Sequence, residues 1–431
     1  MKILLINNHY FIHGGPDRYF FNVKESLEKR GHTVVPFSFQ YNEMIDTPYR
    51  EYFPEPITGR GPCMLCDMRL SGISKLKAIL RMFHNGEVNT KFRKIVRTER
   101  PDIVFSVYLS SSLLPNVLAI AKKEFDLPVV YRLSDFHMFC ASYLFYRAGE
   151  VCTKCLSNPW SAVKHRCVHK SLCASLLRSL QMRYVRLRGW YDSIDAFICP
   201  SELMAHYLAD RNIAIEKIHH VPTFARDFGD REHEMSTEPY VLYFGRIVPE
   251  KGVETLLQAF NKIEKPSFWL KLMGNCSEQY HKQLLAMLDE SHRIRVEIRN
   301  PEQGDALIDT IRHALFIVHP ALWLENMPNT DLESMAAGKA IVASALGSMP
   351  ELVKDGVNGR LFSPGNPTEL AQMLVSLVDA PDKIREMGAF SRVLYERTYT
   401  EDAHMKILLQ IFEAIVRNGQ NGGLLRGRTL S

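Results

Sequence analysis

Two cations stand beside a predicted helix start in the stretch YFGRIVPEKG. Arg246 follows a short apolar run that predicts a strand, and Lys251 comes five residues later, just before a helix predicted to begin near Gly252. Free N–H groups and the dipole at a helix N-terminus attract anions, and Arg and Lys side chains add to that attraction. The pattern therefore indicates a diphosphate site, with two solvated loop cations as the alternative.

Two glutamates, Glu325 and Glu333, lie in the stretch HPALWLENMPNTDLESMAAGKAIVAS. Pro328 and Asn329 predict the start of a helix there, and Gly338 predicts its end before the AIVAS strand. Eight positions along one helix span about 12 Å. The acid pair of a glycosidase lies roughly 5 to 9.5 Å apart, so the spacing favours two separate contacts over one bond-breaking pair.

Short apolar runs alternate with helical patterns, which predicts parallel sheets joined by right-handed crossovers. We expect an N-terminal α/β domain over residues 1–225, a linker over 226–239 and a second α/β domain over 240–399. A last helix, 400–417, is expected to pack back on the N-terminal domain, and residues 418–431 are expected to be disordered. The expected strands are KILLIN, HTVVPFS, PDIVFSV and LPVVYRL in the first domain, and YVLYFG, FWLKLMG, IRVEIRN, ALFIVHP and AIVAS in the second.

The composition is typical of a globular protein of 431 residues, 46% hydrophobic, with 53 Lys and Arg against 48 Asp and Glu. It excludes an intrinsically disordered, collagen-like or disulfide-stapled chain. No run approaches the roughly 18 consecutive apolar residues of a membrane span, and the opening MKILLINNHY has too few apolar residues for a cleaved signal. We therefore expect a cytoplasmic protein.

Three stretches, one of them the cation motif described above, carry a resemblance to a known family. HGGPDRYFFNVKESLEKRGHTV resembles its glycine pair, helix and Gly-His turn, GRIVPEKG resembles its Gly-Arg-x4-Lys-Gly motif, and GSMPELVKDGVNGRLF resembles its Pro-Glu and Asp-Gly-x-Asn-Gly elements. With the two-glutamate stretch, these motifs follow the family's order over nearly the whole chain, which thus resembles the family 4 glycosyltransferases. The resemblance implies the GT-B fold, an α/β architecture in which two Rossmann-like domains face a cleft.

The resemblance also implies a nucleotide-sugar site. Arg246 and Lys251 would hold the nucleotide diphosphate, Glu325 would meet the donor sugar, and Glu333 would accept hydrogen bonds from the ribose hydroxyls. Gly15, which has no Cβ, would let the N-terminal loop approach the phosphates closely. The implied donor-binding residues are Gly14, Gly15, Arg246, Lys251, Glu325, Asn326, Met327, Asn329, Thr330 and Glu333.

Members of this family retain the anomeric configuration, and the sequence offers no convincing nucleophile. The implied mechanism is electrostatic: cations and helix N–H groups stabilise the departing diphosphate while the acceptor hydroxyl attacks from the same face. No cofactor or catalytic metal is required, because Arg and Lys supply the positive charge. The implied reaction moves a sugar from a UDP- or GDP-sugar to a saccharide or lipid-linked saccharide acceptor, in the assembly of surface polysaccharides such as lipopolysaccharide or exopolysaccharide.

The chain departs from the family in two places. Where many members have a His-Asp pair after the fourth strand, RLSDFHMFCAS offers Ser134 and Asp135, with His137 three residues after the serine. Asp135 could orient the acceptor hydroxyl and His137 could replace the missing imidazole, so both join Glu325 as catalytic candidates. A histidine that caps the strand end is the alternative for His137. In the second departure, ENMP, Pro328 has no N–H to give to a sugar.

Cysteines cluster in two CxxC pairs. One pair is Cys63 and Cys66, and the other lies in a basic, Cys-rich insertion at about residues 140–190. Thiolates at this spacing suit tetrahedral zinc, which orders loops that lack a core of their own. A related insertion occurs in some family members, which favours a structural role, with reduced loop thiols as the alternative. The candidate zinc ligands are Cys140, Cys152, Cys155 and Cys167.

The segment from 151 to 191 holds eight Lys or Arg and no acid. Its stretch SLLRSLQMRYVRLRGW predicts a helix with Leu, Met and Tyr on one side and Arg on the other. Such a helix binds an anionic lipid surface at about 1 kcal/mol per well-placed cation, which predicts peripheral attachment to the inner face of the cell membrane. A solvated helix face that packs on its own domain is the alternative.

The sequence leaves other functions open. A nucleotide-sugar epimerase of GT-B fold would need acid and base groups that face the sugar, and would use no acceptor. A zinc-stabilised nucleic-acid-binding protein would account for the CxxC pairs and the basic segment. It leaves Arg246, Glu325 and Glu333 unexplained, so we expect no nucleic-acid partner. A dinucleotide oxidoreductase is disfavoured because no G-x-G-x-x-G follows the first strand.

Overall fold

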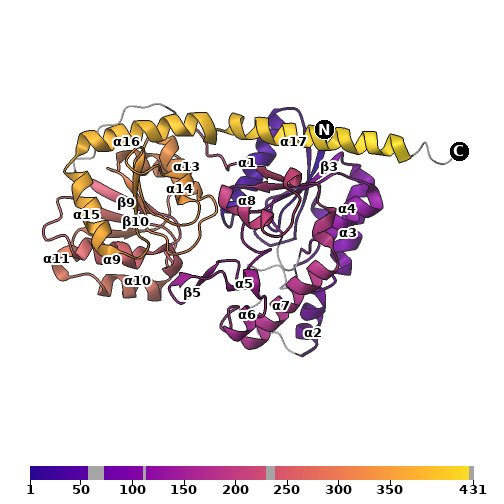
Figure 1. Cartoon of the computed structure of the whole chain (residues 1–431), viewed down its shortest axis with the longest axis horizontal. Helices are drawn as coiled ribbons and strands as arrows, with labels where there is room; N and C mark the ends of the chain where they lie inside the picture. Colours follow the sequence, from indigo (N-terminus) through magenta and orange to yellow (C-terminus); the bar gives the residue numbers. More distant parts are fainter. Residues whose placement is uncertain (57–71, 110–112, 230–237, 427–431) are drawn as a thin grey trace.

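The computed structural model describes residues 1–56, 72–109, 113–229 and 238–426. It contains two α/β domains side by side, each built on a six-stranded parallel sheet (Figure 1). Apolar strands buried on both faces explain why the sequence shows continuous apolar runs rather than alternation. The pattern of strand, helix, strand is therefore read correctly from the sequence.

The N-terminal sheet has the strand order β2-β1-β3-β4-β7-β8. Four of its strands are those that the apolar runs predict, while the last two were not among the expected strands. Its strands are β1 (Lys2–Ile6), β2 (Thr33–Phe37), β3 (Ile103–Ser106), β4 (Val129–Arg132), β7 (Ala196–Cys199) and β8 (Ile218–His220).

The C-terminal sheet has the order β11-β10-β9-β12-β13-β14, which corresponds to the Rossmann order 3-2-1-4-5-6. The strand order reverses between β9 and β12, and ligands in such sheets bind outside the carboxyl ends of the strands at this point. Its strands are β9 (Tyr240–Phe244), β10 (Trp269–Met273), β11 (Val296–Arg299), β12 (Ile317–His319), β13 (Ile341–Ser344) and β14 (Gly359–Phe362).

Helices cover both sheets, and an insertion follows β4. The insertion consists of the hairpin β5 (Tyr146–Arg147) and β6 (Glu150–Val151) followed by three helices. Ser171 caps the longest of them, accepting a hydrogen bond from the Ala174 N–H at 3.3 Å. The helices of the N-terminal domain are α1 (Gly15–Lys29), η1 (Arg50–Tyr52), α2 (Gly72–Arg81), α3 (Gly86–Glu99), α4 (Asn116–Phe125), α5 (Lys154–Ser157), α6 (Ser161–Lys164), α7 (Leu172–Leu187), η2 (Trp190–Ser193), α8 (Glu202–Ala209) and η3 (Ile215–Lys217).

The C-terminal domain has helices between its strands, and a long final helix extends from it toward the N-terminal domain. The helices from the second sheet onward are η4 (Pro249–Lys251), α9 (Val253–Asn261), α10 (Glu278–Ala286), α11 (Glu290–Arg293), α12 (Gly304–His313), α13 (Asn329–Ala336), α14 (Met349–Leu352), α15 (Pro367–Val378), α16 (Pro381–Leu394), the π-helical turn η5 (Tyr395–Tyr399) and α17 (Glu401–Arg426).

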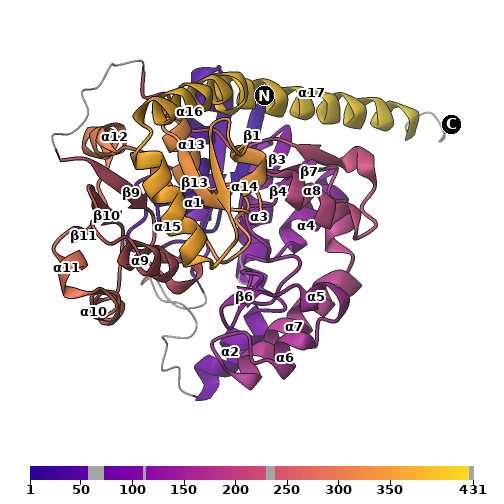
Figure 2. The same cartoon turned by 60° about the vertical axis from the view of Figure 1, so that its left-hand side comes forward.

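Helix α17 crosses back to the N-terminal domain. Figures 1 and 2 both show it alongside that domain, at the end away from α2, α6 and α7. Its residues Met405, Leu408 and Phe412 are fully buried in one cluster with Ile3 and Phe20. This apolar seam ties the end of the chain to the first strand and the first helix.

The last helix ends later than the sequence predicts. Helix α17 runs on to Arg426, so residues 418–426 are helical rather than disordered. A helix nucleated by a packed segment adds one hydrogen bond for each residue it extends, which offsets the weak propensity of the glycines here. Residues 230–237 of the expected linker lie outside the described residues. No helix in the described ranges is long and apolar enough to cross a membrane.

Candidate donor-binding site

The polar residues of the C-terminal domain meet where its strand order reverses. Arg246 follows β9, and His319 ends the neighbouring strand β12. The loop after β12 then carries Glu325 before α13 begins at Asn329, the helix start predicted from the sequence. The fold thus places these side chains at the ligand-binding edge of a doubly wound sheet.

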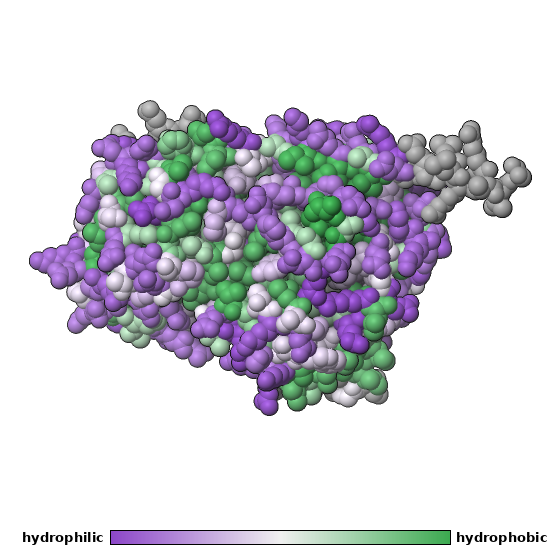
Figure 3. Space-filling view, viewed as in Figure 1, coloured by the Kyte–Doolittle hydropathy of each residue, from purple (hydrophilic) through white to green (hydrophobic). Residues whose placement is uncertain are grey.

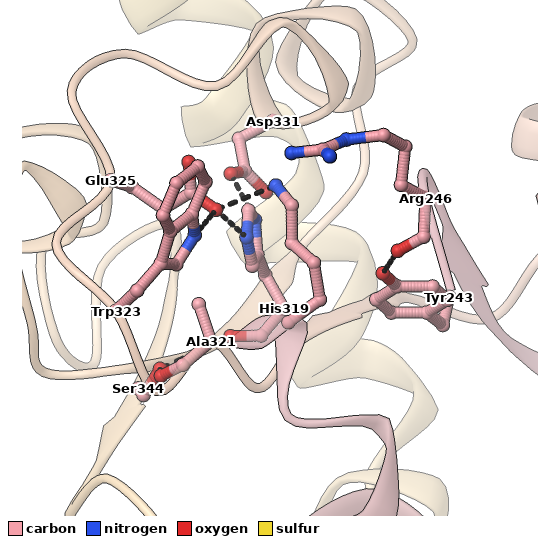
Figure 4. A network of polar contacts seen from close by, with 9 residues as sticks. Tyr243, Arg246, His319, Ala321, Trp323, Glu325, Asp331 and Ser344 are labelled. Atoms are coloured by element: carbon pink, nitrogen blue, oxygen red, sulfur yellow. Dashed lines mark hydrogen bonds and ion pairs between the residues drawn. The ribbon is translucent and has the colours of Figure 1, made fainter. Parts of the chain in front are cut away.

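Glu325 is the centre of a buried polar network (Figure 4). Its Oε1 accepts hydrogen bonds from Lys251 Nζ at 2.6 Å and from Trp323 Nε1 at 2.5 Å, and lies 3.1 Å from His319 Nε2. Only 5% of Glu325 is exposed. A buried carboxylate with several charged or polar donors is fixed in position and kept ionised.

The pKa values of this network follow from its charges. Burial would raise the pKa of Glu325, but Lys251 and His319 hold it well below its usual range. Burial would lower the pKa of His319, yet the carboxylates of Asp331 and Glu325 raise it to about 9. At neutral pH Glu325 is therefore ionised and His319 is protonated.

His319 and Asp331 were missed by the sequence analysis. His319 Nδ1 lies 2.5 Å from Asp331 Oδ2, and Asp331 is fully buried in the first turn of α13. The available signal was a histidine at the end of a buried strand, ALFIVHP, followed by an acid in a helix N-terminus. The sequence does not show that these two residues are in contact, because the contact forms only when the fold brings the strand end and the helix start together.

Two glycines permit the close loop packing around Glu325. Gly252 has φ +71°, and a Cβ there would lie 1.8 Å from the carbonyl oxygen of Pro320. Gly347 has φ +65°, and its Cβ would lie 2.5 Å from the backbone nitrogen of Glu325. Only glycine meets both requirements without backbone movement. The glycines of GRIVPEKG and GSMPE therefore set the position of Lys251 and Glu325.

Arg246 stands at the edge of this network with an exposed side chain. Its carbonyl oxygen accepts a 2.6 Å hydrogen bond from the buried Tyr243 hydroxyl, which fixes the backbone. Figure 4 shows its guanidinium extending toward the Glu325 network. Lys251 lies with its Nζ 5.3 Å from the ring centroid of Trp323. The structure thus brings Arg246, Lys251 and Glu325 together, with Arg246 open to a ligand.

The glycine loop of the N-terminal domain faces α13. Asp17 holds this loop, because its Oδ2 accepts the backbone N–H groups of His13 and Gly14 at 3.2 and 3.0 Å. A Cβ on Gly15 would lie 3.5 Å from Asn329 Nδ2. The Gly14–Gly15 pair and the start of α13 therefore approach each other across the domain interface.

Glu333, the expected ribose ligand, is held by the other domain. Its Oε1 lies 2.6 Å from Arg18 Nη1, so helices α1 and α13 are joined by an ion pair. Burial raises the pKa of Glu333, and the Arg18 guanidinium partly opposes that shift. In this arrangement the Glu333 carboxylate, which was expected to accept hydrogen bonds from the ribose hydroxyls, is paired with Arg18.

The remaining donor candidates have different surroundings. Asn326 is engaged across the domain interface, with Nδ2 donating to the Leu133 carbonyl at 2.9 Å and Oδ1 accepting from the Ser201 hydroxyl at 2.8 Å. Met327 is partly buried against the core around α13. The methyl group of Thr330 faces Gly245, the residue before Arg246. The side chain of Thr330 thus lies next to the residue that precedes Arg246.

Asp135 and His137 lie together at the end of β4. Asp135 Oδ1 accepts the backbone N–H of His137 at 2.9 Å, and its Oδ2 lies 3.5 Å from His137 Nδ1. Burial lowers the pKa of His137, and the nearby Arg178 guanidinium lowers it further. His137 is thus partly buried in the N-terminal domain, beside Asp135 and Arg178.

Three cysteines of the insertion are neighbours. The thiols of Cys140 and Cys155 are in hydrogen-bonding contact, which lowers the pKa of Cys140 to about 6, and Cys167 lies near both. No group of three or more His, Cys, Asp or Glu in the described residues is placed to hold a metal ion. The zinc assignment of Cys140, Cys152, Cys155 and Cys167 stays a prediction, and Cys63 and Cys66 lie outside the described residues.

Two facing Rossmann-like domains with this site define a GT-B glycosyltransferase fold. Residues 13–225 match the family described as Glycosyltransferase Family 4, and residues 226–393 match the family described as Glycosyl transferases group 1. The chain belongs to the family 4 glycosyltransferases. The resemblance noted in the sequence is thereby confirmed.

Relatives and solved structures agree with this assignment. An uncharacterized glycosyltransferase of Methanocaldococcus jannaschii, MJ1178, is 25% identical over 54% of this chain and 63% of its own. A D-inositol 3-phosphate glycosyltransferase of Streptomyces coelicolor is 30% identical over 34% of each chain. The matched stretch is thus less than two thirds of either relative's length.

Similarity to solved structures spans almost the whole chain. A glycosyltransferase from Rickettsia africae has a TM-score of 0.68 at 17% identity, over 97% of this chain and 99% of that chain. Anabaena Alr3699/HepE in complex with UDP and glucose has a TM-score of 0.63 at 16% identity, over 95% of this chain and 99% of that one. At these identities the similarity establishes the fold.

Proposed function

We propose that this protein transfers a sugar, with retention of configuration, from a nucleotide-diphosphate donor to a saccharide or lipid-linked saccharide acceptor. The observation that carries the proposal is the ionised, buried Glu325 held by Lys251 and His319 beside the exposed Arg246. A UDP- or GDP-sugar is the expected donor, and a relative in fold binds UDP and glucose. Family membership favours this reaction over the epimerase and nucleic-acid-binding alternatives.

Each group of the network has a role in the proposed reaction. Arg246, with Lys251 beside it, stabilises negative charge as the diphosphate leaves. The Glu325 carboxylate faces the donor sugar and stabilises the positive charge that develops at its anomeric carbon. Protonated His319 orients Glu325 and is itself oriented by Asp331. These interactions grow with charge separation, so they favour the transition state over the bound donor.

The acceptor is expected on the N-terminal domain, where Asp135 could orient its hydroxyl. We propose that this domain binds the inner face of the cell membrane, because the assembly of surface polysaccharides on a lipid carrier takes place there. Exposed leucines support the assignment: in Figure 3 hydrophobic side chains gather at the lower right, where α2 and α7 lie in Figure 1. The exposed leucines of these two helices are Leu76 and Leu80 of α2 and Leu172, Leu176, Leu180 and Leu187 of α7.

The test begins with binding. Thermal shift and calorimetry with UDP, GDP and ADP compare the wild type with Arg246→Met and with Arg385→Met, an exposed arginine of α16 far from β9 in sequence. We expect one nucleoside diphosphate to bind. Arg246→Met should weaken its affinity about tenfold or more, because an arginine–phosphate hydrogen bond is worth about 1.5 to 3 kcal/mol. Arg385→Met should leave the affinity unchanged.

A second measurement addresses the reaction. Proton NMR of the product formed from the matching nucleotide sugar should show the donor's anomeric configuration. Inversion would contradict the retaining mechanism. Absence of binding by every nucleoside diphosphate would contradict the proposed function as a whole.

A further inference from the structure

A hollow in the N-terminal domain lies between α7 and the end of β4. It is a small hollow that is open to solvent at its mouth. Polar groups face it from α7, from β4 and from the segment after β4, among them Tyr131, His137, Arg178 and Gln181, with Arg186 also on its lining. None of the lining residues in the described part of the chain is acidic. We call this cavity the α7 hollow.

Arg178 is a buried cation with neutral hydrogen-bond partners. It is 9% exposed; Nη1 donates to Gln181 Oε1 at 2.5 Å, and Nη2 donates to the His137 carbonyl at 3.1 Å. No carboxylate among the described residues lies within ion-pair distance of it; burial lowers the pKa of Arg178, and the Asp135 carboxylate opposes that shift from further away. A buried charge without a counter-ion is costly, and a ligand anion removes that cost.

His137 brings a second unpartnered group to the same wall. Its Nε2 is buried and has no hydrogen-bond partner in the described ranges. The ring lies close enough to Arg178 for the guanidinium to lower its pKa. An anion between Arg178 and His137 would give this nitrogen a hydrogen-bond partner. Its negative charge would also be stabilised by both groups, which otherwise disfavour each other's positive charge.

We propose that the α7 hollow is an acceptor subsite that binds a phosphate ester of the acceptor through Arg178 and His137, with Arg186 at its rim. The inference rests on the proposed function and names the acceptor's chemical class. A phosphate ester fits better than a carboxylate because a dianion uses two guanidinium groups, and Arg178 and Arg186 both lie on the hollow.

Helix α7 also has two different sides, one lining the α7 hollow and one carrying exposed apolar residues. At about 100° per residue, Arg178, Met182 and Val185 fall on the side that lines the hollow, while the exposed Leu176 and Leu180 fall on the opposite side. One helix therefore presents a phosphate site inward and an apolar stripe outward. This arrangement suits an acceptor whose phosphate is carried on a lipid.

The test measures phosphate binding with the donor site filled. Phenyl phosphate is titrated calorimetrically into protein saturated with the nucleoside diphosphate identified above, and phenol is titrated as the control for the ring. The variants are Arg178→Met, Arg178→Lys and Arg183→Met, the last being an exposed cation of the same helix that does not line the hollow. His137→Asn is the second test variant if Arg178→Met fails to fold.

The expected result is binding of phenyl phosphate, but not of phenol, by the wild type. Arg178→Met and His137→Asn should weaken it, the former about tenfold or more, whereas Arg183→Met should not. Arg178→Lys, which keeps the charge, should weaken it less than Arg178→Met. Nucleoside diphosphate affinity should stay unchanged in the Arg178 and Arg183 variants, which reports an intact fold.

Vesicles distinguish the source of the phosphate. Binding to phosphatidylcholine vesicles with and without phosphatidic acid is compared for the wild type and Arg178→Met. If phosphatidic acid strengthens vesicle binding by the wild type but not by Arg178→Met, the subsite is assigned to a lipid phosphate. If phosphatidic acid has no effect while phenyl phosphate still binds, the subsite is assigned to a soluble sugar phosphate. Equal phenyl phosphate affinity in the wild type and Arg178→Met, or no binding by a wild type that binds the nucleoside diphosphate, overturns the proposal.

Discussion

Glu325 Oε1 lies 3.1 Å from Nε2 of His319, and both side chains are about 95% buried. The pair connects the loop before α13 to the end of β12, and Asp331 and Lys251 extend it on either side. Because each charge has an opposite neighbour, the network can stay ionised in a buried place. It thereby keeps a carboxylate ready at the site of the proposed donor sugar.

The pH dependence of stability should report this pair. The pKa of His319 is raised to about 9 in the folded protein, against about 6.5 when unfolded. Its stabilising contribution is therefore complete below about pH 6.5 and is lost as pH rises through about 9. We expect the difference in Tm between the wild type and His319→Gln to shrink over this window. A difference that stays constant across it, by differential scanning fluorimetry, would show that His319 is not charged in the fold.

Release of Arg18 should affect nucleotide binding. If Glu333 receives ribose hydroxyls, the Arg18–Glu333 ion pair must open first. Arg18 is 42% exposed, so the pair is worth about 0.2 to 1 kcal/mol, and Arg18→Met should tighten nucleoside diphosphate binding by up to about fivefold. Arg226→Met, which breaks the exposed ion pair with Glu25, is the calorimetric control and should have no effect. Weaker binding by Arg18→Met would mean that Arg18 itself contacts the nucleotide.

Glycine substitutions should separate backbone strain from steric overlap. Gly356 has φ +76° with nothing within 4 Å of a built Cβ, so Gly356→Ala should lower the free energy of unfolding by about 1 to 2 kcal/mol. Gly252 has similar φ but a Cβ there meets the Pro320 carbonyl, so Gly252→Ala should lose about 1 to 3 kcal/mol more. Urea denaturation of the two variants gives the comparison. Equal losses would refute the role assigned to the close approach at Gly252.

Truncation of a buried side chain on α17 should destabilise the N-terminal domain. Phe412 is fully buried, with its ring centroid 5.2 Å from that of Phe105 on β3. Phe412→Ala should cost about 3 to 5 kcal/mol through lost burial and the cavity left behind. Ile407, on the same helix but 38% exposed, should cost far less as Ile407→Ala. If both variants unfold at the same urea concentration, α17 does not contribute to this core.

Local patterns in the sequence were sufficient for much of the fold and part of the site. The apolar runs predicted β1 and β9 because parallel strands are buried on both faces. The cation pair in GRIVPEKG and the helix start after Pro328 were also predictable, because turn glycines, prolines and helix termini are encoded within a few residues. The short strands β7 and β8 were not predicted: β8 has one apolar residue followed by two histidines, whereas the apolar run AFIC of β7 was overlooked.

The sequence by itself determined the fold family, the strand-end position of Arg246 and the helix that begins at Asn329. Only the tertiary structure decided which charges meet. Lys251 and Glu325 are 74 positions apart, and Arg18 and Glu333 are 315 apart. No periodicity within one segment encodes such contacts, because they depend on how two strand ends, or two domains, approach each other. The buried Arg178 is a similar case: its helix pattern is local, but the absence of a carboxylate partner in the described structure is a property of the packed domain.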